Sequence, residues 1–180
     1  HSHDDEHIWL SLLNAQNLTQ VLADRLSRLD PDHASSYQKN AAAYIKELKA
    51  LDGEYRQTVE AAQNNTLLFA DRFPFRYLMD DYGLDYFAAF AGCSAETEAS
   101  FETITFLSTK VDELALNHVL VLEGADKDLA STVIANTTDK NQAVIVFDSM
   151  QSVDRAALNE GVTYLGIMEA NLQALATALQ

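Results

Sequence analysis

Short apolar runs that alternate with helical patterns constrain the fold of residues 64–180 most strongly. Four such runs, each as long as a buried strand, lie at residues 66–70, 86–90, 119–122 and 143–147. Apolar residues recur at helical spacing over residues 75–82, 101–114, 126–134 and 163–179. Because strands that alternate with helices form parallel βαβ units, we predict a three-layer α/β lobe around a four-stranded, mainly parallel sheet flanked by helices.

A purely helical pattern precedes this lobe. Apolar residues at helical spacing from Leu18 to Leu29 predict a shorter helix. Asp30-Pro31 then marks a break and a restart, because Asp caps helices and Pro suits a first turn. An apolar stripe from Tyr37 to Val59 predicts one long helix that ends before Asn64. We therefore divide the chain into a leading segment (1–30), a long linking helix (31–63) and the α/β lobe (64–180).

Composition excludes several classes of function. The chain has 180 residues, 48% of them hydrophobic, which is enough for an ordinary core. Its 27 acidic and 12 basic residues give a net charge of −15, which argues against nucleic-acid binding. The single cysteine, Cys93, excludes an internal disulfide and a structural Cys zinc site. No phosphate-loop, dinucleotide, nucleophile-elbow or H-E-x-x-H motif occurs, so we expect that the chain is not an enzyme.

Potential metal ligands crowd the N-terminal segment. His1, His3 and His7 share this segment with three consecutive carboxylates at positions 4–6. Imidazole and carboxylate groups suit zinc and related ions. A solvated polar loop or part of a tag is the alternative, but tags are usually uninterrupted His runs. The segment therefore favours metal capture.

Carboxylates also follow three of the four predicted strands. Asp71, Glu123 and Asp148 come directly after the first, third and fourth apolar runs. Ligands of parallel sheets bind beyond the carboxyl ends of the strands. Carboxylates that converge there repel one another unless a cation, a proton or an Arg is present, and a divalent metal would resolve that repulsion. The alternatives are a turn cap for Asp148 and an ion pair of Asp71 with Arg72 or Arg76.

A series of segments resembles the zinc/manganese solute-binding proteins of bacterial metal-uptake ABC transporters. The first is Glu6-His7-Ile8-Trp9-Leu10, which is similar to the family's D-P-H-[IV]-W-L. The later ones are, in order, Leu29-Asp30-Pro31 with its long helix, Asp81-Tyr82-Gly83-Leu84 (Y-G-L), residues 92–100 (G-x-S-P-E-x-E-P-S), Val146-Phe147-Asp148-Ser149, and Tyr164, Met168, Asn171 and Leu172 (Y-x-x-x-M-x-x-N-L). Because they cover the chain in order, the chain resembles that family's C-terminal portion.

The resemblance implies a site with four protein ligands. One His would come from a first lobe, of which residues 1–30 would be the remnant. His7 would be the second ligand and Asp148 the fourth, so residues 64–180 would form the metal-binding lobe. At the third position, where the family has a His or Glu, residues 70–72 read Ala-Asp-Arg, and Asp71 is the only plausible donor. His1 and His3 would collect metal, while Glu123 and Arg72 would support the ligands.

The implied function is extracytoplasmic binding of a divalent transition metal. We expect zinc, with manganese as the alternative, and delivery to the membrane permease of an ABC transporter. The protein would be periplasmic or lipid-anchored to the outer face of the cell membrane, and a monomer. Two alternatives stay open: a divergent solute-binding protein for another metal or a non-metal ligand, and a surface adhesion-type lipoprotein.

Overall fold

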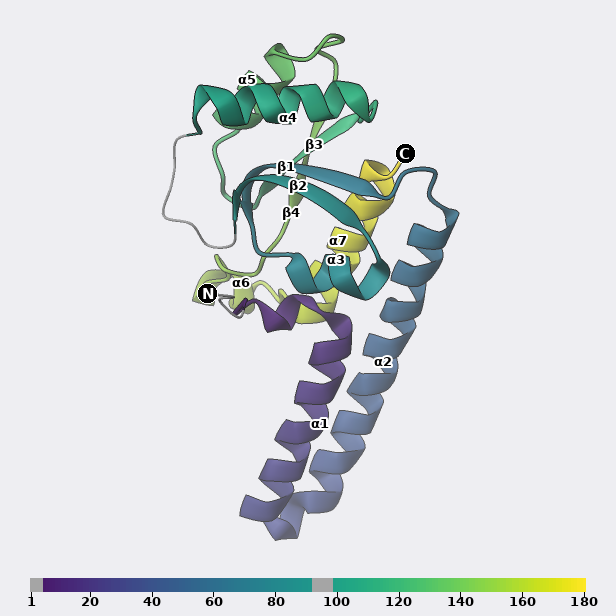
Figure 1. Ribbon diagram of the computed structural model, residues 1–180. Coiled ribbons are helices and arrows are strands. Elements are labelled where there is room, and N and C mark those ends of the chain that lie inside the picture. Colours follow the sequence, from purple (N-terminus) through teal and green to yellow (C-terminus); the bar gives the residue numbers. More distant parts are fainter. Residues whose placement is uncertain (1–4, 92–98) are drawn as a thin grey trace.

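Two antiparallel helices form a hairpin that projects from an α/β lobe. The computed structural model describes residues 5–91 and 99–180. Helix α1 (Leu12–Leu29) and helix α2 (Ala34–Ala61) are joined by the short 3-10 turn η2 (Pro31–His33) and lie side by side (Figure 1). Helix α2 is the long helix that the apolar stripe predicts. No helix in the described ranges is long and apolar enough to cross a membrane.

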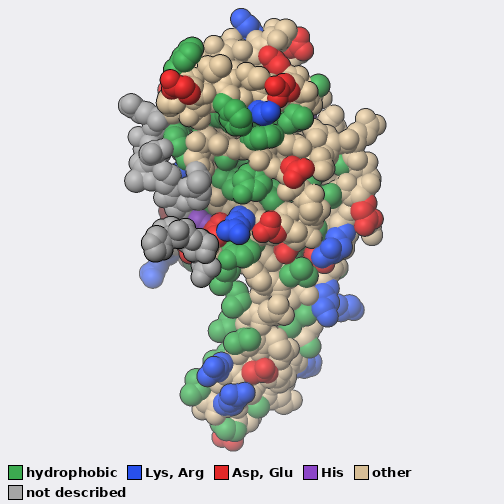
Figure 2. Space-filling model, viewed as in Figure 1, with side chains coloured by type: hydrophobic (Ala, Val, Ile, Leu, Met, Phe, Trp, Pro, Cys, Tyr) green, Lys and Arg blue, Asp and Glu red, His purple; other side chains and the backbone are tan. Residues whose placement is uncertain are grey.

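The apolar stripe that predicts α1 is largely exposed. Leu22 keeps 62% of its surface accessible and Leu29 keeps 82%, and Leu18, Val21 and Leu26 are also exposed. Figure 2 shows hydrophobic side chains along this part of the hairpin. The stripe thus identifies the helix correctly, but it packs into no core among the described residues.

The lobe contains one four-stranded parallel sheet, as predicted. Its strand order is β2-β1-β3-β4, with strands β1 (Thr66–Phe73), β2 (Asp85–Ala91), β3 (His118–Leu122) and β4 (Ala143–Phe147). Helices α4 (Phe101–Glu113) and α5 (Asp128–Ala135) cover one face, and α3 (Arg76–Tyr82) and α7 (Tyr164–Ala178) lie at the other (Figure 1). A short helix α6 (Arg155–Asn159) precedes α7. This three-layer arrangement confirms the predicted fold class.

The strands alternate between two cores. On β3, Leu120 and Leu122 pack with α2, α3 and α7, whereas Val119 and Val121 pack with α4 and α5. Side chains of a strand point alternately to its two faces, so a strand buried on both faces is apolar throughout. This is why the short apolar runs of the sequence are strands. Because all four strands run parallel, their carboxyl ends lie at one edge of the sheet.

Strand β1 is longer than its apolar run. It continues to Phe73, and its pairing with β2 shifts register between Phe69 and Arg72. Asp71 therefore lies within a strand, at an irregularity, and the expectation that it occupies the turn after the strand is wrong. An irregularity of this kind locally redirects side chains.

Candidate metal centre

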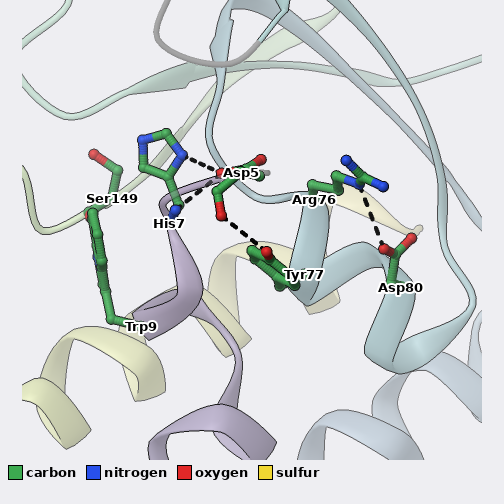
Figure 3. Close-up of polar contacts among 7 residues, drawn as sticks. All are labelled: Asp5, His7, Trp9, Arg76, Tyr77, Asp80 and Ser149. Carbon is green, nitrogen blue, oxygen red and sulfur yellow. Dashed lines mark hydrogen bonds and ion pairs between the residues drawn. The ribbon is translucent and has the colours of Figure 1, made fainter. Parts of the chain in front are cut away.

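His7 lies just before the short 3-10 helix η1 (Ile8–Leu10) and is buried, with 1% of its surface exposed. Its ring Nδ1 is 2.6 Å from Oδ1 of Asp5, and the same oxygen accepts the backbone N–H of His7 at 3.0 Å (Figure 3). The ring also packs edge-on against Trp9, with centroids 5.3 Å apart. The imidazole is therefore held from two sides.

Trp9 connects this segment to the end of the sheet. Its indole Nε1–H donates to the carbonyl of Ser149 at 3.1 Å (Figure 3). Its own carbonyl accepts the hydroxyl of Tyr164 at 2.7 Å. The first bond docks η1 on the loop that follows β4 and the second docks it on the start of α7, so the candidate ligand His7 lies near the loop that carries Asp148.

Asp148 follows β4 directly and is half-buried. Its Oδ1 accepts the backbone N–H of Met150 at 2.7 Å, so the side chain does make the turn bond that the cap alternative requires. Burial raises the pKa of Asp148, the Met150 N–H opposes this, and the nearby charge of Glu123 raises the pKa further. A bound cation would relieve this unfavourable environment of the carboxylate.

Glu123 organises the same loop. Its Oε2 accepts the backbone N–H of Ser149 at 2.8 Å, and its Oε1 accepts the hydroxyls of Ser149 at 2.7 Å and Ser152 at 3.0 Å. Burial raises the pKa of Glu123, but these hydrogen bonds outweigh burial and hold the pKa below its usual value. Both oxygens of Glu123 accept hydrogen bonds from the loop after β4, so Glu123 can hold the loop that carries Asp148.

Asp71 links two strands of the sheet. Its Oδ2 accepts the backbone N–H of Leu122 at 3.0 Å, and its Oδ1 accepts that of Arg72 at 2.7 Å. The Arg72 Nε lies 3.9 Å from Oδ1, a long ion pair, whereas Arg76 pairs with Asp80 at 3.8 Å. Of the two alternatives weighed for Asp71, the structure shows the Arg72 pair.

The structure brings only part of the predicted site into one cluster. Within residues 5–91 and 99–180, the group of three or more potential ligands whose donor atoms all lie within 4.8 Å of one another is Asp5, Glu6 and His7. Asp71 and Asp148 do not join that group. His1, His3 and Cys93 lie outside the described residues.

The sequence reasoning missed Asp5. Positions 4–6 are all acidic, so residue type alone does not single it out. Two signals were available: the D-P-H-[IV]-W-L segment also has an Asp two residues before its His, and Asp side chains commonly accept the backbone N–H two residues further on. That bond brings Asp5 to His7.

Known proteins share this fold and sequence pattern. The ZnuA family, described as the periplasmic component A of a zinc-uptake complex, matches residues 1–178. The zinc-binding lipoprotein AdcA of Streptococcus pneumoniae TIGR4 is 33% identical over 176 residues, which is 97% of this chain and 34% of AdcA. The chain thus spans about a third of that relative's length.

Two solved structures are similar over nearly the whole chain. The Zn(II)-bound ZnuA-like domain of S. pneumoniae AdcA gives a TM-score of 0.79 at 30% identity and covers 97% of this chain and 64% of that one. The laminin-binding adhesin Lmb of Streptococcus agalactiae, in a mutant structure, gives 0.82 at 25% identity and covers 98% and 63%.

Fold and matches together define a metal solute-binding protein. More particularly, the chain belongs to the ZnuA family of zinc-uptake components. This membership agrees with the expectation that the chain is not an enzyme.

Proposed function

We propose that the chain binds Zn²⁺ reversibly outside the cytoplasm and serves a zinc-uptake ABC transporter by delivering the ion to its membrane permease. The buried imidazole of His7, docked beside the loop of Asp148, is the observation that carries this proposal. Membership in a zinc-uptake family and similarity to a Zn(II)-bound domain support zinc over manganese. Neutral imidazole and carboxylate are suitable zinc ligands.

His7, Asp148 and Asp71 are the proposed ligands, with His1 and His3 as accessory groups that collect zinc. Asp71 would have to share its oxygens between the metal and two backbone N–H groups, which a carboxylate with about four acceptor positions allows. Glu123 and Arg72 would hold Asp148 and Asp71 in place. Residues 1–30 would then belong with a first lobe, 31–63 would link the lobes, and 64–180 would form the metal-binding lobe.

The proposed location follows the relatives. The family is described as periplasmic, and AdcA as a lipoprotein. We infer a periplasmic or lipid-anchored protein that acts as a monomer.

Calorimetric titration with Zn²⁺ tests the ligand assignment. We expect His7→Ala and Asp148→Ala each to lower zinc affinity, and Asp80→Ala, an exposed carboxylate paired with Arg76, to leave it unchanged. A parallel titration with Mn²⁺ should show weaker binding. Unchanged zinc affinity in both ligand variants would remove the basis of the proposal.

Adhesion is a second candidate function. It is favoured by the similarity to the laminin-binding adhesin Lmb. Binding of immobilised laminin by the purified chain, with and without zinc, would test it. No binding above that of an unrelated acidic protein would exclude this function for the chain.

A further inference from the structure

We propose that Asp5 is a positioning residue that fixes both the orientation and the tautomer of the His7 imidazole. This proposal rests on the proposed role of His7 as a zinc ligand. It assigns to Asp5 a task at Nδ1 of the ring, while Nε2 would bind the metal.

Both bonds from His7 end on one oxygen of Asp5. Oδ1 lies 2.6 Å from the ring Nδ1 and 3.0 Å from the backbone nitrogen of His7 (Figure 3). One bond fixes the backbone and the other fixes the ring, so the shared oxygen sets the rotation of the imidazole relative to its own backbone. Both side chains are largely buried, with 2% exposed for His7 and 11% for Asp5, so water competes weakly for these bonds.

The chemistry of the pair selects one tautomer. An ionised carboxylate only accepts hydrogen bonds, so the ring nitrogen that faces it must carry the proton. In a neutral imidazole with Nδ1–H, the lone pair resides on Nε2, so Nε2 is the nitrogen that can bind a metal. In Figure 3 this second nitrogen points away from Asp5. A carboxylate behind a ligating His also makes the ring a stronger ligand.

Asp5 is itself held by the lobe. Its backbone carbonyl accepts the hydroxyl of Tyr77 on α3 at 2.9 Å (Figure 3). On the other side of His7, Trp9 packs against the ring and is bonded to Ser149. The His7 ring thus sits between two anchors, one on α3 and one on the loop after β4.

Nitrogen-15 NMR of the histidine rings in the metal-free chain tests the tautomer directly. We expect His7 to carry its proton on Nδ1 in the wild type. Asp5→Ala should shift it toward the Nε2–H form. Asp5→Asn should keep Nδ1–H, because the His7 backbone N–H holds the amide oxygen in the place of Oδ1. Asp80→Ala should leave the tautomer unchanged and controls for the loss of a carboxylate nearby.

Zinc affinity, measured by competition with a chelator, tests the consequence. Loss of a carboxylate behind a metal-bound His typically costs about 10–100-fold in affinity, so we expect a loss of that size for Asp5→Ala. Asp5→Asn should recover most of it. If Asp5→Asn keeps the tautomer but binds zinc as weakly as Asp5→Ala, zinc affinity depends on the negative charge of Asp5 and not on its positioning of the ring, and the positioning role is wrong. If Asp5→Ala changes neither the tautomer nor the affinity, the proposal is also overturned.

The two readouts separate this proposal from the proposed function. The tautomer is measured without metal, so it reports on the Asp5–His7 pair whether or not the chain binds zinc. Failure of the proposed function would appear as unchanged zinc affinity in His7→Ala, with the tautomer still responding to Asp5→Ala. Circular dichroism of each variant excludes unfolding as the cause of either change.

Discussion

Asn171 forms both hydrogen bonds to the backbone of Asp148. Its Oδ1 accepts the Asp148 N–H at 2.9 Å, and its Nδ2–H donates to the Asp148 carbonyl at 2.8 Å. Asn171 is 2% exposed and lies on α7, so this helix fixes the backbone of a proposed zinc ligand at the end of β4. The side-chain amide of Asn carries an acceptor and a donor on one carbon, so a single side chain satisfies both backbone groups.

Asn171→Ala should therefore lower both stability and zinc affinity. It leaves two backbone groups without their partner, which costs ~1–3 kcal/mol in the free energy of unfolding. Urea unfolding measures this loss. Gln173→Ala, an exposed position on the same helix, is the control and should change the free energy of unfolding little. An Asn171→Ala protein as stable as the wild type would show that these two hydrogen bonds contribute nothing to the free energy of unfolding.

Glu123→Gln should weaken the loop after β4 in a pH-dependent way. The pKa of Glu123 is lowered in the folded chain, so its ionised form stabilises the fold above its ordinary pKa of 4.5, and this contribution is lost as pH falls through the lowered value. We expect the variant to lose ~1–3 kcal/mol near neutral pH. The difference from the wild type should shrink in acid.

Unfolding of the wild type and Glu123→Gln across a pH series measures this effect. Glu113→Gln, which alters an exposed carboxylate paired with Lys110, serves as the matched control. A difference between wild type and Glu123→Gln that is constant with pH would contradict the assigned cause.

Zinc binding should weaken on acidification, in part through Asp148. Because burial and the Glu123 charge raise the pKa of Asp148, protons compete with the metal at this carboxylate from a higher pH than at an ordinary Asp. We expect Asp148→Asn to lower affinity at neutral pH by at least about tenfold, the lower bound typical of a metal-site partner, and to flatten the pH dependence. Zinc titrations at several pH values would reveal an unaltered slope if Asp148 takes no part.

Asp81 should limit stability at neutral pH. Burial raises its pKa most, the Ser11 hydroxyl at 2.6 Å opposes this, and Asp52 raises it further. Since the folded pKa is raised, the stabilising contribution is complete below the unfolded value of 3.8 and is lost as pH rises through the folded value. We expect Asp81→Asn, whose amide oxygen can still accept from Ser11, to be at least as stable as the wild type near neutral pH.

Asp81→Ala separates the charge from the hydrogen bond. It removes the acceptor of the Ser11 hydroxyl and should cost about 1 kcal/mol. Thermal unfolding of the two variants side by side checks the sign of each change. A destabilised Asp81→Asn would mean that the charge itself holds α1 to α3.

The pattern of apolar residues was sufficient to predict the strands of the sheet. It was not sufficient where contacts with other parts of the chain determine the structure. The run at residues 119–122 is apolar at every position because β3 is buried on both faces, so it is readable without knowledge of the rest. The end of β1 was misplaced because the strand continues past its apolar run, through Asp71, by pairing with β2. The apolar stripe from Leu18 to Leu29 predicts a helix, but the spacing of its residues does not show what, if anything, packs against that face.

In the candidate site, too, some residues can be identified from the sequence, whereas the contacts that hold them cannot. His7 and Asp148 are identifiable by residue type and by their place in a resembling motif. Which side chain supports each of them depends on contacts that no spacing encodes, such as the bond between Trp9 and Ser149, 140 positions apart. Asp5 lies between these cases. Its place two residues before His7 matches the Asp of the family's D-P-H segment, but only the contact between the two side chains shows that it holds the ring.

The exposed leucines of α1 have a consequence for local unfolding of the hairpin. A side chain that stays in water on folding, such as Leu29, gains little free energy from burial, so the outer part of the hairpin is held mainly by the seam between its two helices. The C-terminal half of α2 packs into the core of the lobe through Leu48, Leu51 and Tyr55. Amide protons should therefore exchange fastest near the turn at residues 31–33 and progressively more slowly toward Tyr55, because local unfolding begins at that end of the hairpin.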